Sequence, residues 1–93
     1  MLRIDRVTDG GFTVLKLSGR IEEEYLAQLQ SEIGHSGHSP KLDLRDVSLV
    51  DRASVRFLIR CESHGIQLAN CPLYIQEWIS RERGRADSRV DNE

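Results

Sequence analysis

The stretch from Lys41 to Gly65, KLDLRDVSLVDRASVRFLIRCESHG, constrains the fold most, because its hydrophobic period changes halfway. Its first ten residues form a dense apolar run, which favours a strand covered on both faces over a strand with one face in water. After the polar step 51–54, apolar residues recur at helical spacing, at Val55, Leu58 and Ile59. The stretch therefore predicts a buried strand, a short loop and an amphipathic helix.

The loop between the strand and the helix holds two candidate N-caps. The Asp51 carboxylate can accept hydrogen bonds from the unpaired N–H groups of the first helical turn, and its charge complements the helix dipole. Ser54 is the competing cap, because serine is also strongly preferred at such positions. The start of this helix is where we expect the functional surface.

A hairpin is predicted at the N-terminus. Residues 2–7 alternate weakly and residues 12–17 alternate more clearly, with Leu15 and Leu17 on one face. Glycines at positions 10 and 11 can take the positive φ angles that a tight turn needs. We expect two antiparallel strands, the second of which is broken by the Ser-Gly-Arg sequence at 18–20.

Two more helices and a short strand are predicted around the central stretch. A helix over 22–33 has an acidic first turn, and a turn-rich connection over 34–40 follows it. Residues 66–68 are typical of a short strand. Pro72 is placed to begin a third helix, whose apolar face holds Ile75, Trp78 and Ile79.

These elements predict an α/β fold with a mixed, mostly parallel sheet of about four strands, starting with a hairpin, and about three helices. Residues 1–80 are expected to form one domain. Residues 81–93 have almost no apolar content, so we expect a disordered tail.

Composition argues against two classes of protein, nucleic-acid binders and membrane-inserted proteins. The formal net charge of −2, from 13 basic and 15 acidic residues, argues against nucleic-acid binding through bulk electrostatics. No apolar run reaches membrane-spanning length and the first residues lack a signal-peptide core, so we expect a cytoplasmic protein without membrane insertion. Cys61 and Cys71 are expected to be reduced.

Segment 51–55 resembles the signature of STAS domains, whose best-known members are bacterial anti-sigma-factor antagonists. That family usually reads Asp-Ser-(Ser/Thr/Ala)-Gly-Leu here, with a regulatory hydroxyl that a partner kinase phosphorylates. Asp51 and Val55 match the aspartate and the apolar residue. Arg52 and Ala53 fill the hydroxyl positions and Ser54 fills the glycine position, so the usual phosphorylation switch is expected to be inoperative.

A second segment, residues 17–22 (LSGRIE), is similar to the Leu-x-Gly-x-Leu-Asp sequence that opens the first STAS helix. Together the two segments imply a regulatory protein–protein interaction module that is not an enzyme. The resemblance implies an anti-sigma factor or a switch-type kinase as partner. The implied docking surface comprises Asp51, Arg52, Ala53, Ser54, Arg56 and Arg60.

The arginines at 52, 56 and 60 recur at i, i+4 and i+8, so they form one stripe that would suit an acidic partner. A plain solvated helix face explains the same pattern. Ser54 could be a displaced phosphate acceptor, although it lies out of register with the usual site, and a structural cap explains it better.

Two other functions fit the same resemblance or the same residues. One is an accessory subunit of a membrane transport ATPase, since STAS domains also attach to such complexes. The other is a sensor of a small anion or nucleotide bound at the helix start with help from Arg52. Family members usually continue with a further strand and helix, so this sequence indicates either a minimal version of the fold or an exposed surface that a partner or a second copy of the chain, in a homodimer, would cover.

Cofactor, metal and catalytic chemistry have little support in the sequence. His35 and His38 form a pair in a loop, but no CxxC accompanies them, so no metal site is expected. No His or Lys is placed beside a plausible nucleophile, and no glycine-rich phosphate loop is present. We expect no cofactor.

Overall fold

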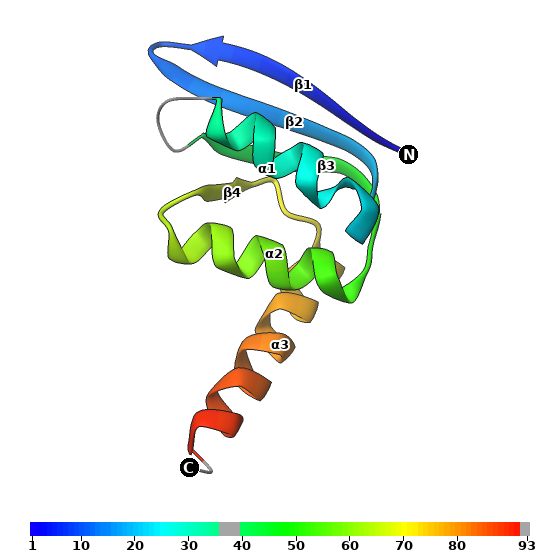
Figure 1. Ribbon diagram of the computed structural model, residues 1–93, viewed down its shortest axis with the longest axis vertical. Helices are drawn as coiled ribbons and strands as arrows, with labels where there is room; N and C mark the ends of the chain where they lie inside the picture. Colours follow the sequence, from blue (N-terminus) through cyan, green and yellow to red (C-terminus); the bar gives the residue numbers. More distant parts are fainter. Residues whose placement is uncertain (36–39, 92–93) are drawn as a thin grey trace.

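The computed structural model describes residues 1–35 and 40–91, with only the backbone described for Asp9 and for residues 85–91. The elements are β1 (Leu2–Asp9), β2 (Phe12–Ile21), the 3-10 turn η1 (Glu23–Tyr25), α1 (Leu26–Gly34), β3 (Lys41–Val50), α2 (Arg52–Ser63), β4 (Gln67–Ala69) and α3 (Leu73–Asp91). The predicted α/β fold is confirmed, with a four-stranded mixed sheet and three helices (Figure 1).

The sheet has the strand order β1-β2-β3-β4. The first two strands form the predicted antiparallel hairpin, and both glycines of its turn have positive φ. The other two pairings are parallel. β2 does not break at 18–20 as predicted: it continues to Ile21, because Gly19 adopts φ +92° inside the strand next to a shift in the β2–β3 register.

β3 corrects the prediction of a strand buried on both faces. Its buried residues follow the spacing Leu42, Leu44, Val47 and Val50, while Arg45 and Leu49 are exposed. The register with β2 shifts twice along β3. After each shift, the next residue that faces the core comes one position later in the sequence than regular alternation would place it. The dense apolar run therefore reflects two bulges in a strand with one covered face.

α1 and α2 cover the same face of the sheet (Figure 1). The inward side chains of β2 and β3, including Leu15, Leu17 and Leu42, are almost completely buried beneath them. Each helix contributes to this core, α1 with Leu29 and α2 with Leu58. The opposite face of the sheet carries both polar and apolar side chains: Lys16 is exposed there, Arg3 pairs with Asp5 at 3.1 Å, and Val7 and Phe12 are exposed hydrophobic residues of the same face.

α3 packs against α2 and projects beyond the sheet (Figure 1). Residues 81–91, which the sequence predicts to belong to a disordered tail, are assigned to the last turns of α3. Glu82 and Arg83 turn toward α2 and form ion pairs with it, which gives this polar segment contacts that its composition does not reveal. Residues 92–93 lie outside the described residues.

Two further sequence expectations can be compared with the structure. Both cysteines are free thiols, and burial raises the pKa of Cys61 to about 11, so this thiol stays protonated and unreactive near neutral pH. In the described part of the chain, no helix is both long enough and apolar enough to cross a membrane.

Candidate functional site

Asp51 joins the starts of two helical segments. Its Oδ1 accepts a hydrogen bond from the backbone N–H of Ser54 at 2.8 Å, so Asp51 is the N-cap of α2. Its Oδ2 accepts from the backbone N–H of Glu23 at 2.9 Å, at the start of η1. One carboxylate therefore satisfies an unpaired N–H of each segment, in the position favoured by the helix dipole.

Ser54 is completely buried in the third position of α2, so it is not the cap. Its hydroxyl oxygen lies 2.7 Å from the carbonyl oxygen of Ile21 and 2.6 Å from Oδ1 of Asp51. A serine hydroxyl has a single proton, which these two acceptors share. A role as phosphate acceptor would require this hydroxyl to leave its buried position.

The electrostatics of Asp51 follow from these contacts. Burial acts to raise its pKa, yet the hydrogen bonds from the Ser54 side chain and from the N–H groups of Ser54 and Glu23 outweigh it and lower the pKa. The carboxylate is thus ionised at neutral pH. Since it already occupies these helix starts, the two N–H groups are donated to Asp51 and not to an external anion.

The two segments that resemble the STAS signatures meet at this junction. The carbonyl of Ile21 accepts hydrogen bonds from the Ser54 hydroxyl and from the N–H of Asp51. The ends of β2 and β3 are therefore fixed to each other.

Gly19, two residues before Ile21, is needed for a close approach of the chain start: a Cβ at this position would lie 2.4 Å from the carbonyl oxygen of Met1, which accepts the N–H of Arg20.

The arginine stripe of α2 is partly engaged by α3. Glu82 is buried, and its Oε1 lies 3.6 Å from Nε of Arg52 and 3.4 Å from Nε of Arg56. Arg60, farther along α2, lies over the ring of Phe57 at 5.8 Å from the centroid. All three arginines remain exposed on α2.

Of the predicted site residues, the structure brings Arg52, Arg56 and Arg60 to the surface and leaves Ala53 half-buried among them. Asp51 and Ser54 turn inward and support that surface from beneath. The sequence interpretation missed Glu82, because it assigned this residue to a disordered tail. A signal was present, since Ile75, Trp78, Ile79 and Glu82 continue one helical face at i, i+3, i+4 and i+7.

A pocket of about 360 Å³ lies between the start of α2 and α3. It is lined by Arg52 from α2 and by Trp78, Arg81 and Glu82 from α3. Trp78 and Arg81 are further residues that the sequence interpretation did not assign to the site. The pocket joins two guanidinium groups, an aromatic ring and a carboxylate that already pairs with Arg52 and Arg56.

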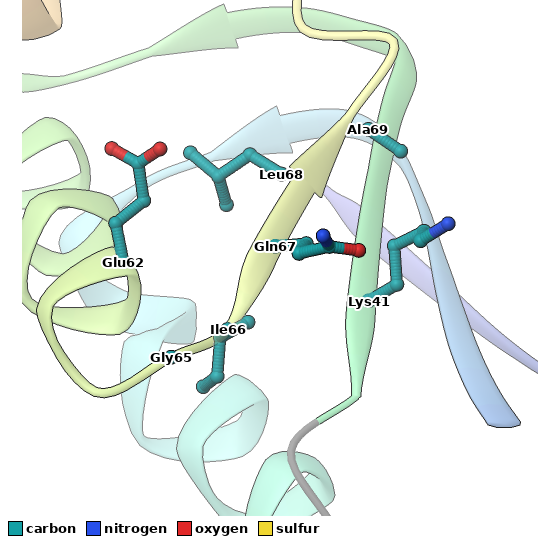
Figure 2. Close-up of a pocket in the computed structure, with 7 residues that line it drawn as sticks. All are labelled: Lys41, Glu62, Gly65, Ile66, Gln67, Leu68 and Ala69. Atoms are coloured by element: carbon teal, nitrogen blue, oxygen red, sulfur yellow. The ribbon is translucent and has the colours of Figure 1, made fainter.

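A second hollow, of about 560 Å³, follows the outer edge of β4 (Figure 2). Lys41 points away from Glu62 in this view, so the charged groups on its two sides do not converge on a common point. Among the side chains that the structure describes, no group of three or more His, Cys, Asp or Glu residues could hold a metal ion. His38, half of the histidine pair noted in the sequence, lies outside the described residues.

A comparison of the chain with protein-family models found no match, and a comparison with curated protein sequences found none either.

Proposed function

We propose that this chain is a regulatory protein–protein interaction module of the STAS type, without enzymatic activity, that binds a protein partner through the exposed side of α2. The partner class implied by the resemblance is an anti-sigma factor or a switch-type kinase, and the cytoplasm is the expected location. In this proposal the surface formed by Arg52, Ala53, Arg56 and Arg60 contacts the partner.

The observation that carries the proposal is the Asp51 junction. Its carboxylate holds the starts of η1 and α2 through hydrogen bonds of 2.9 and 2.8 Å, and Ser54 is buried beneath it. Polar groups are thus used to fix the backbone at this point, while Arg52, Arg56 and Arg60 face outward from α2. A rigid, exposed helix start is suited to docking, because little ordering entropy is lost when a partner binds.

The absence of a hydroxyl at positions 52 and 53 implies that binding is not controlled by the usual phosphorylation. Incubation with a cognate switch kinase and ATP should leave the protein unmodified, as checked by intact mass. Stoichiometric phosphate on Ser54 would contradict this part of the proposal and would show that the start of α2 opens in solution.

The docking surface can be tested with Ala53→Glu. Ala53 lies in the first turn of α2, where a negative side chain is compatible with the helix dipole, so the variant should fold normally. The new side chain would nevertheless obstruct the arginine surface and lower its positive charge. Affinity capture from a lysate of the organism that encodes the chain, followed by mass spectrometry, should recover a regulatory kinase or sigma-controlling protein with wild type and lose it with Ala53→Glu.

The matched control is Gln30→Glu, which adds the same charge at an exposed position of α1. It should retain the partner. If Ala53→Glu and Gln30→Glu recover the same proteins as wild type, the partner does not dock on the start of α2. Recovery of a membrane transport ATPase by wild type would instead favour the accessory-subunit function.

A further inference from the structure

We infer that the pocket between α2 and α3 receives an acidic segment of the protein partner, with a carboxylate held by Arg52 and Arg81 and a neighbouring apolar side chain packed on Trp78. This inference rests on the proposed function, because it names the chemistry of the partner that docks beside the start of α2. It goes beyond that function by including α3 in the binding surface.

Charge is the first argument. Arg52 and Arg81 line the pocket, and Arg56 lies beside it on the next turn of α2. The one carboxylate among them, Glu82, is shared by Arg52 and Arg56. Arg81 is exposed and has no ion pair within the described part of the chain. Three guanidinium groups against one carboxylate leave this surface positive, which complements an acidic segment.

The geometry of Glu82 is the second argument. This carboxylate contacts Nε of both Arg52 and Arg56, while about half of each arginine side chain remains exposed, 54% and 49%. A guanidinium has five N–H donors in a planar fork, so a contact with one carboxylate leaves other N–H donors available for hydrogen bonds. Glu82 therefore shows that this surface holds a carboxylate, and Arg52, which lines the pocket, keeps further N–H donors beyond this contact.

The pocket also has an apolar wall, which argues for a peptide over a free anion. Trp78 is half-buried and lines the cavity, so it contributes aromatic surface that an aliphatic or aromatic side chain can cover. The backbone N–H of Ser54 at the nearby helix start is already donated to Asp51. A small anion would find arginines here but not the cluster of N–H groups on which such sites usually depend.

The test starts from a peptide library displayed on phage and selected on the full chain. Peptides enriched on wild type should carry Asp or Glu next to an apolar residue, and counter-selection on Arg81→Ala should remove them. The strongest peptide is then synthesised and titrated into the protein while tryptophan emission is recorded. Trp78 is the sole tryptophan of the chain, so its emission reports on this pocket directly.

We expect a saturable change in Trp78 emission that weakens with added salt. Arg81→Ala should weaken binding about tenfold, as expected for loss of one charge-assisted hydrogen bond. Arg3→Ala is the matched control, because it removes the same charge from the face of the sheet opposite the helices, where the side chain is 77% exposed. It should bind the peptide as wild type does.

Three results would overturn the inference: enriched peptides without acidic residues, equal weakening by Arg3→Ala and Arg81→Ala, or the same change in emission with inorganic phosphate alone. These failures differ from failure of the proposed function. If Ala53→Glu loses the partner while no acidic peptide binds, the proposed docking surface on α2 is supported and the inference of an acidic partner segment is contradicted. If an acidic peptide binds but Ala53→Glu keeps its partners, binding of an acidic segment in the pocket is supported and the proposed docking surface is contradicted.

Discussion

The junction between β3 and α2 and the contact between α2 and α3 both depend on a carboxylate, yet they use it differently. At the first, Asp51 accepts hydrogen bonds of 2.8 and 2.9 Å from backbone N–H groups. At the second, Glu82 meets two long arginine side chains at 3.4 and 3.6 Å, and about half of each arginine is in water.

The difference indicates what each carboxylate contributes. Backbone donors are fixed by the chain, so the Asp51 hydrogen bonds cost little side-chain entropy and leave costly unpaired groups if removed. Half-exposed ion pairs gain little over hydration and require long side chains to be ordered. α3 is therefore held mainly by Ile75 and Ile79, which are buried against the core, and the arginines next to Glu82 remain adaptable.

The largest effect is expected for Asp51→Ala. The substitution leaves the N–H groups of Glu23 and Ser54 without their acceptor, so we expect a loss of about 3 kcal/mol in the free energy of unfolding. Urea denaturation followed by circular dichroism measures it. Asp51→Asn should lose less, since its carbonyl oxygen can still accept one of the two N–H groups.

Asp46→Ala is the control for this prediction, because Asp46 is an exposed aspartate of β3. It should change the free energy of unfolding by no more than about 0.5 kcal/mol. Equal losses for Asp46→Ala and Asp51→Ala would show that the junction is not specially stabilised.

Gly19→Ala should cost about 2 kcal/mol, because it forces an L side chain into φ +92° and against the Met1 carbonyl. Thermal unfolding checks the sign and size. Gly34→Ala is the matched substitution: it lies in α1 with no atom within 4 Å of the added Cβ, and alanine favours a helix. Loss of stability in both variants, to the same extent, would remove the special role of Gly19.

Glu82→Gln should cost only about 1 kcal/mol, since Arg52 and Arg56 can be hydrated and the amide oxygen still accepts a hydrogen bond. Ile79→Ala should cost more, because it opens a cavity beneath α3. Urea denaturation of both variants ranks the two contributions. The reverse order would mean that the ion pairs, and not the apolar residues, hold α3 in place.

The smallest effect concerns pH. Burial alone would raise the pKa of Asp51, but its hydrogen bonds lower it, so the folded state binds this proton less readily than the unfolded state. The stabilisation is fully present above the unfolded pKa of about 3.9 and is lost as pH falls through the lower folded pKa. The stability difference between wild type and Asp51→Asn should therefore be constant near neutral pH and shrink below about pH 4. A difference that stays constant in acid would contradict the lowered pKa.

Local signals accounted for most of the fold. The hairpin followed from two adjacent glycines between alternating residues, and the boundary of α2 followed from a change of period after Asp51. The errors arose where tertiary contacts altered a local pattern. In β3, two bulges produced an apolar pattern like that of a strand covered on both faces. β2 continued through Gly19 because Ile21 is buried and its carbonyl accepts two hydrogen bonds.

The sequence by itself determined that α2 starts at the step 51–54 and made Asp51 one of two candidate caps, because Asp51 and its donor, Ser54, are three residues apart and helix geometry alone brings them together. Only the tertiary structure decided the second donor of Asp51, the burial of Ser54 and the place of Glu82. Their partners are 28, 33 and 26 residues away along the chain. Such contacts form only after strands and helices have packed, and no local spacing encodes which distant groups that packing brings within hydrogen-bond distance.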